Sequence, residues 1–141
     1  MWPRNFSERL ESWAQLRQQC SQLDSEPALI KINSWWFQTP WSAYHLHWDD
    51  QEDWPDPWQL LSDNIYCPLA RGLGIMYTIS MLERSDLQDV CMIEYQSDNL
   101  VLVNKEKYIL NWDPDQVVNI SLGKSKIKRR VSQEQIKQKI R

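Results

Sequence analysis

One stretch decides the fold: Asn64-Ile-Tyr-Cys-Pro-Leu-Ala-Arg-Gly-Leu-Gly-Ile-Met-Tyr-Thr-Ile-Ser-Met-Leu82, the most apolar part of the 141-residue chain. Pro68 suits the first position of a helix, where its missing N–H costs nothing, and this places Cys67 at the N-cap. Gly72 and Gly74 each weaken a helix by about 1 kcal/mol relative to alanine, so we expect them to admit a close neighbour. The stretch therefore predicts a central buried helix.

Two amphipathic helices are predicted before this stretch. The first carries an apolar stripe at spacings of three and four residues from Phe6 to Leu23, and the second runs from Ser25 to Pro40. Residues 41–48 are either a short strand or an extended connection. The acidic, proline-punctuated run 49–57 predicts a loop, and Asp56 then caps a short helix.

The sequence changes period after the central helix. Three runs rich in β-forming residues, 90–95, 100–104 and 107–112, are separated by short polar turns. They predict a three-stranded antiparallel meander, with 117–122 as a candidate fourth strand. The predicted fold class is α+β, with N-terminal helices and a central Cys-capped helix packed on a three- to four-stranded antiparallel meander.

The charge divides the chain near Gly123. Residues 124–141 hold eight of the sixteen Lys and Arg residues and one of the nineteen acids, so this segment carries +7 and residues 1–123 carry −10. We therefore expect one globular α+β domain over residues 1–123 and a basic C-terminal arm over 124–141, with a capping-box spacing from Ser132 to Gln135. The predicted partner-binding residues of the arm are Lys124, Lys126, Lys128, Arg129, Arg130, Lys137, Lys139 and Arg141.

Tryptophan is unusually abundant, with nine in the chain and eight of them within the first 58 residues. Tryptophan combines a large apolar area with one N–H donor, which suits sites where a core meets a polar edge or a partner. We expect part of this set to face another protein. The candidates are Trp35, Trp36, Trp41, Trp48, Trp54 and Trp58.

Cys67 is the sharpest candidate for chemistry. A thiol at a helix N-terminus faces unpaired backbone N–H groups, which favour the thiolate. A nucleophilic cysteine needs a base, and His45 and His47 are the only histidines, with Asp49 next to them to orient one. The structural alternative is that Cys67 fills space at a helix start and that both histidines lie in a packed or solvated aromatic stretch. The ligand spacings of a zinc site are missing, so we expect neither a metal nor a cofactor.

The order of elements resembles the core of transglutaminase-like cysteine proteins. The resemblance rests on Cys67-Pro-Leu-Ala-Arg-Gly-Leu-Gly at the start of an apolar helix, followed by a meander. It implies that Cys67 is the nucleophile, with a histidine opening the first meander strand and an aspartate on the next. Val90 stands at the histidine position, and Asn111 or, with a small shift, Asp113 at the aspartate position. A catalytic reading therefore needs His45 or His47 as the base, in a rearranged chain order.

The segments Trp54-Pro-Asp-Pro-Trp58 and Asn64-Ile-Tyr-Cys-Pro-Leu-Ala-Arg-Gly-Leu-Gly are also similar to small proteins of tailed bacteriophages, particularly myophages of cyanobacteria. This resemblance implies a virion or assembly component. A Trp-rich face and a basic arm suit a protein that lodges between other subunits.

Three function classes follow. The leading one is a non-catalytic structural or interaction protein that engages phage structural subunits, or further copies of itself, through tryptophans and the basic arm. The second is a cysteine hydrolase or acyltransferase using Cys67. The third is a nucleic-acid-associated factor whose arm binds phosphates. Three dispersed cysteines are typical of a reducing cytosol, and the longest apolar run is too short to cross a bilayer, so we expect the host cytoplasm or the virion and no membrane partner.

Overall fold

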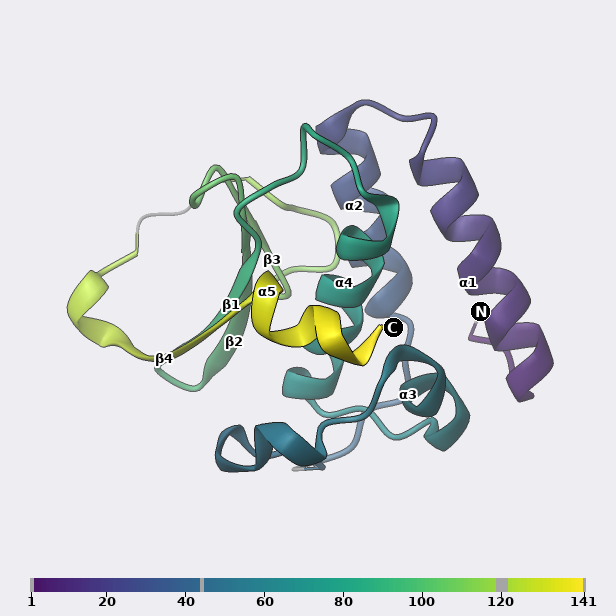
Figure 1. Ribbon diagram of the computed structural model, residues 1–141, viewed down its shortest axis with the longest axis horizontal. Helices are drawn as coiled ribbons and strands as arrows, with labels where there is room; N and C mark the ends of the chain where they lie inside the picture. Colours follow the sequence, from purple (N-terminus) through teal and green to yellow (C-terminus); the bar gives the residue numbers. More distant parts are fainter. Residues whose placement is uncertain (1, 44, 119–121, 141) are drawn as a thin grey trace.

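The computed structural model describes residues 2–43, 45–118 and 122–140. Its central element is helix α4, Pro68–Leu82, which lies between a layer of helices and a β-sheet (Figure 1). Cys67 is its N-cap and Pro68 its first residue, and residues 72–80 are all buried. The prediction of a buried, Cys-capped central helix is confirmed.

The helical layer consists of α1, Phe6–Cys20, and α2, Ser25–Trp36, with the short α3, Pro57–Asp63, packed against α1 and α4. Two of these helices begin at residues whose side chains satisfy a free backbone donor. The Asn5 side chain accepts from Glu8 N at 2.8 Å, and the Asp56 carboxylate accepts from Gln59 N at 2.7 Å. The Asp56 cap follows the sequence prediction.

The acidic run is not wholly a loop, because Trp48–Asp53 forms the 3-10 helix η1. Two indoles anchor it: Trp48 and Trp54 are buried, and their rings meet edge to face at 5.7 Å. Trp54 Nε1 also donates to the carbonyl of His47 at 2.9 Å. The exposed carboxylates obscured this element, because the residues that fix it lie only at its two ends.

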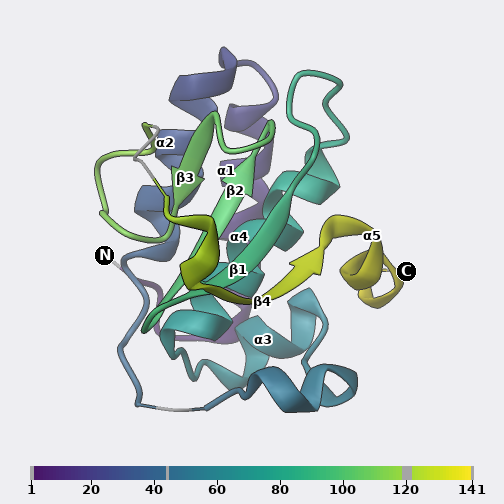
Figure 2. The ribbon, with the colours of Figure 1, turned by 90° about the vertical axis from the view of Figure 1, so that its left-hand side faces the viewer.

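The sheet contains β1, Cys91–Tyr95, β2, Asp98–Val103, β3, Tyr108–Leu110, and β4, Ile127–Ser132, in the order β3-β2-β1-β4 (Figure 2). All neighbours are antiparallel, so the predicted meander of an α+β fold is confirmed. The candidate strand at 117–122 includes residues 119–121, which lie outside the described residues. In its described part, Val118 makes an isolated antiparallel bridge with Tyr108.

The C-terminal segment differs most from expectation, because its described part is built into the domain. β4 pairs with β1 from Cys91 opposite Ser132 to Tyr95 opposite Ile127. It leads into α5, Gln133–Ile136, which begins with the predicted capping box of Ser132 and Gln135, and then into η3, Lys137–Lys139. Val131 and Ile136 are buried in the main core. The described part of residues 124–141 therefore belongs to the domain and does not form a separate arm.

The two helix glycines admit close neighbours, as predicted. A Cβ on Gly74 would lie 2.5 Å from the indole ring of Trp36, and one on Gly72 would lie 2.6 Å from Met92 Sδ. Both distances are shorter than real Cβ contacts allow. Gly74 therefore brings α2 close to α4, and Gly72 brings β1 close to α4, so that the helix fits between the two layers.

A buried polar cluster joins α1 and α2 to α4. The indole Nε1 atoms of Trp13 and Trp36 each donate to Thr78 Oγ1 at 2.9 Å. The same hydroxyl donates to the carbonyl of Gly74 at 2.8 Å. All three side chains are at most 1% exposed, so one hydroxyl satisfies two indoles that have no access to water.

In the described part of the chain, every helix falls short of the length and apolarity that crossing a membrane requires.

Candidate functional site

A groove with a volume of about 970 Å³ opens at the N-terminal end of α4. We call it the α4 groove. Four parts of the chain build it: the segment from residue 41 into η1, the start of α4, the β1–β2 hairpin, and β4. Its lining comprises Trp41, Ala43, Leu46, His47, Trp48, Asp49, Cys67, Pro68, Leu69, Glu94, Gln96, Ser97, Asn99, Lys128 and Arg129. Several residues singled out in the sequence meet here, from distant positions in the chain.

Cys67 lies in this groove with its sulfur held by backbone donors. Its Sγ accepts from Ala70 N at 3.5 Å, which is the N-cap bond of α4, and from Leu46 N at 3.4 Å. The residue is 4% exposed. Two N–H groups from separate segments of the chain therefore donate to one sulfur.

The predicted catalytic set is only partly brought together. His47 and Asp49 line the groove with Cys67, whereas His45 lines a neighbouring pocket of about 300 Å³ beside α3. Within the described residues, no imidazole is hydrogen-bonded to Cys67 Sγ, whose partners are the two N–H groups. Asp49 accepts from Arg129 instead of orienting a histidine. The residues share a groove but are not linked as a triad.

Arg129 of β4 connects two walls of the groove. Its Nη1 lies 2.7 Å from Asp49 Oδ1 in η1, and its Nε lies 3.4 Å from Glu94 Oε1 in β1. Its side chain is 43% exposed, so water screens both pairs and each contributes at most about 1 kcal/mol. The two ion pairs matter more for the shape of the groove than for stability, because one guanidinium joins η1 to the sheet.

A polar cluster beneath the groove fixes the start of α4 to the sheet. Asn111 Nδ2 donates to the carbonyl of Pro68 at 3.0 Å and to that of Asn99 at 2.6 Å, and its Oδ1 accepts from Arg71 Nε at 2.6 Å. The Asn111 backbone N–H donates to Asn33 Oδ1 at 2.9 Å. Burial lowers the pKa of the Arg71 guanidinium, although the nearby Cys67 raises it slightly.

Sequence reasoning missed this cluster. One signal was present, because Arg71 is the only charged residue in the apolar stretch and needs a partner there. Asn111 also has φ 73°, a left-handed conformation that asparagine tolerates better than most residues. Through Asn111 and Asn99, the cluster reaches the groove wall, where Asn99 Oδ1 accepts from Trp48 Nε1 at 2.8 Å.

Most of the tryptophans predicted to face a partner lie inside the protein. Trp36, Trp48 and Trp54 are buried, and Trp35 is half-buried with its Nε1 bonded to Ser12 Oγ at 3.0 Å. Trp41 is 73% exposed and Trp58 40% exposed. The expected Trp-rich face is thus reduced to two exposed indoles, and of these only Trp41 lines the α4 groove.

The predicted basic residues are spread over several elements. Lys124 and Lys126 lie in η2, Lys124–Lys126, and Lys128, Arg129 and Arg130 lie in β4. Lys137 pairs with Glu134 at 3.5 Å, and Lys139 Nζ donates to the carbonyl of Glu52 at 3.2 Å. Arg141 lies outside the described residues.

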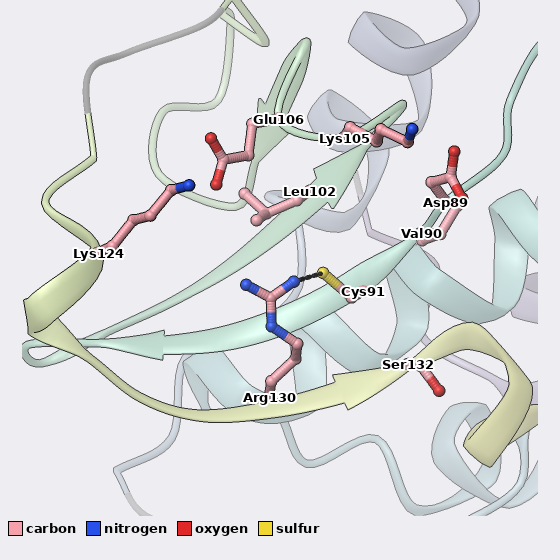
Figure 3. Close-up of a pocket in the computed structure, with 9 residues that line it drawn as sticks. All are labelled: Asp89, Val90, Cys91, Leu102, Lys105, Glu106, Lys124, Arg130 and Ser132. Atoms are coloured by element: carbon pink, nitrogen blue, oxygen red, sulfur yellow. Dashed lines mark hydrogen bonds between the residues drawn. The ribbon is translucent and has the colours of Figure 1, made fainter.

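A second hollow, of about 480 Å³, lies on the face of the sheet that points away from α4 (Figure 3). Arg130 extends over Cys91 there, and its Nη1 lies 3.4 Å from the sulfur. Burial raises the pKa of the Cys91 thiol, and Arg130 lowers it by a smaller amount. Val90, the position matched to a histidine in the transglutaminase-like comparison, lines this hollow and not the α4 groove.

The described residues contain no group of three or more His, Cys, Asp or Glu side chains arranged to hold a metal ion. Comparison of the chain with family models, curated proteins and solved structures gives no match.

Proposed function

We propose that this protein is a non-catalytic interaction protein that binds another protein through the α4 groove. One observation carries the proposal: Trp41 is 73% exposed at a groove of about 970 Å³, whereas most of the other described tryptophans are buried or half-buried. An indole left in water costs hydrophobic free energy that a partner would recover, and tryptophan is enriched among the residues that dominate binding energy.

The groove has the size and chemistry for a peptide segment of a partner. Its volume lies near the upper end of the usual range for ligand sites. Apolar side chains, Leu46 and Leu69, line it beside charged ones such as Lys128 and Glu94. This mixture is typical of protein interfaces, in which apolar anchors are surrounded by polar groups. The resemblance to phage proteins favours another subunit of a phage particle as the partner.

Selection from a random-peptide display library tests this proposal, because the library itself supplies the candidate ligands. Peptides selected on the wild-type protein are expected to bind the variant Trp41→Ser at least tenfold more weakly. Trp58→Ser is the matched control, because Trp58 is also exposed but does not line the groove. An unenriched library, or equal binding by both variants, would contradict the proposal.

A cysteine enzyme is the second candidate, and one observation favours it: Cys67 Sγ receives two backbone N–H groups in the same groove as His47. If the thiolate forms at this site, iodoacetamide at pH 6 labels Cys67 rapidly and stoichiometrically in the folded protein. His47→Ala is then expected to slow the labelling. Labelling of Cys67 only after unfolding would exclude a nucleophilic role.

A further inference from the structure

β4 is an edge strand, and in the described part of the chain its outer side is not paired with another strand. Residue pairs 90/133, 92/131 and 94/129 form the hydrogen-bonded rungs with β1, because Gln133 N donates to the carbonyl of Val90 and rungs alternate along an antiparallel ladder. The backbone groups of Arg130 and Ser132 therefore point away from β1. Ser132 N accordingly meets its own cap, Gln135 Oε1, at 2.8 Å. The C=O of Ser132 is engaged as well, because Ser132 is the N-cap of α5 and its carbonyl accepts the first bond of that helix. This leaves the N–H and C=O of Arg130 without a backbone partner among the residues that the structure describes.

Cations without acidic partners among the described residues lie on β4 and on η2, which directly precedes it. Lys124, Lys126, Lys128 and Arg130 are exposed, and none of them forms an ion pair with a residue that the structure describes. Arg129 differs, because Asp49 and Glu94 already neutralise it. An edge of this kind attracts negative charge.

Space is present on both faces of the strand. Arg130 and Ser132 line the hollow on the outer face of the sheet (Figure 3), and Lys128 and Arg129 line the α4 groove on the other. Successive side chains of an added strand would point alternately to these two faces. Acidic side chains on the outer face would lie beside Arg130, and small apolar ones on the inner face would lie at the rim of the α4 groove formed by Lys128 and Arg129.

We propose that the outer edge of β4 binds an extended acidic segment of a partner protein, which adds to the sheet as a fifth strand. This surface borders the α4 groove, but the proposal does not depend on what fills that groove. Pairing of β4 with a second copy of itself is disfavoured, because Lys128, Arg129 and Arg130 would then lie beside like charges. An acidic strand has the opposite charge and supplies the backbone partners that the edge lacks.

The probe is a fluorescein-labelled peptide of alternating glutamate and valine, followed by fluorescence anisotropy at low and physiological salt. We expect it to bind, and we expect the same peptide with lysine for glutamate not to bind. In an antiparallel strand the residues that bond Arg130 carry their side chains on its own face, so in this peptide they are the glutamates. A version with N-methylated glutamates keeps the charge and loses the backbone donors on the edge that faces Arg130, so we expect at least tenfold weaker binding. Equal binding of the N-methylated peptide would show charge attraction alone and would overturn strand addition.

Two variants separate the contribution of the Arg130 side chain to binding from that of its backbone N–H. Arg130→Ala removes the charge, whereas Arg130→Pro also removes the outward N–H, and an edge strand tolerates proline at such a position. We expect Arg130→Pro to bind several-fold more weakly than Arg130→Ala, with circular dichroism and melting temperature as checks on folding. If neither variant folds, the N-methylated peptide on the wild-type protein still decides the question.

Two further outcomes would also overturn strand addition. A labelled oligothymidylate that binds more than tenfold tighter than the acidic peptide would identify a nucleic-acid surface and overturn the proposal. If the peptide does not bind, the proposal is wrong. The lysines would then protect an exposed edge strand against aggregation, which is the other common role of charged residues at a sheet edge. Trp41→Ser is expected to leave binding of the Glu–Val peptide unchanged, so failure of the groove proposal and failure of this one are distinguishable.

Discussion

Thr78→Val is the most informative single substitution for the fold. Valine has nearly the shape of threonine, so packing between α1, α2 and α4 is retained. The hydroxyl that accepts from both Trp13 Nε1 and Trp36 Nε1 is lost, and both donors lie out of reach of water. Each buried donor without a partner costs about 1–3 kcal/mol, so the two together cost roughly 2–6 kcal/mol.

That loss is a large fraction of the stability of a domain, which is typically about 5–15 kcal/mol. Urea unfolding followed by circular dichroism measures it directly. For a chain of this length we also expect the melting temperature to fall by at least about 6 °C. Thr78→Ser is the matched control, because it keeps the acceptor and loses only a methyl group, at a cost of about 1 kcal/mol.

A double-mutant cycle makes the reasoning specific. In a Trp13→Phe background one of the two donors is already absent, so Thr78→Val is expected to cost about half as much as in the wild type. A free energy of unfolding for Thr78→Val within about 0.5 kcal/mol of the wild-type value would show that the shared hydroxyl does not hold the helices together.

Three further predictions concern other buried groups. Gly74→Ala should destabilise the protein by about 1–3 kcal/mol in urea unfolding, because the new Cβ meets the Trp36 ring at 2.5 Å, whereas Gly123→Ala, whose Cβ finds its nearest neighbour at 3.6 Å, should change little. Tyr66→Phe should be neutral or stabilising by thermal melting, since the buried Tyr66 hydroxyl has no hydrogen-bond partner among the described residues; a loss above about 1 kcal/mol would reveal a partner. Burial raises the pKa of Cys20 from 9.0 to about 11, so the folded state holds this proton more tightly; the resulting stability is complete below pH 9 and is lost as the pH rises towards 11. Cys20→Ala should flatten that decline, and identical slopes of unfolding free energy against pH in the two proteins would contradict the shift.

The central helix and the meander could be predicted because their signals are local. Cys67-Pro68 marks a helix start by the geometry of one turn, and the strands between residues 90 and 112 are separated by short polar turns. The two glycines in α4 indicated close neighbours because they weaken the helix they occupy. The sequence did not say which neighbours, since Trp36 and Met92 are contacts made across the fold.

β4 could not be predicted because its signal is dominated by charge. An edge strand needs few buried positions, and in β4 only Val131 is fully buried, while Lys128, Arg129 and Arg130 face water. A sequence segment of this kind predicts a solvated arm, because its pairing with β1 is not visible in the segment itself. The same limit applies to the tryptophans, because composition does not tell whether an indole N–H will meet Thr78, Asn99 or solvent.

The α4 groove was out of reach for a related reason. Its walls come from residues within 41–43, 46–49, 67–69, 94–99 and 128–129, so no window of the sequence contains it. Local reasoning did place Cys67, His45, His47 and Asp49 in one candidate site, and all of these except His45 line the groove. It could not show that Arg129 would take the Asp49 carboxylate, since these two residues are brought together only by the pairing of β4.

The place of β4 in the sheet also sets the order in which the sheet assembles and opens. The β1–β2 hairpin closes over residues 96–97, whereas the β1–β4 pair closes over residues 96–126. The longer closure costs roughly 2 kcal/mol more chain entropy, so β4 should join late in folding and leave first in local unfolding. Each opening bares the edge of β1 at Cys91, Met92 and Ile93, residues that are otherwise buried. In hydrogen exchange, the amides of β4 and their partners in β1 should therefore exchange together and ahead of β2, and the cationic strand would serve as a removable cover over an aggregation-prone edge.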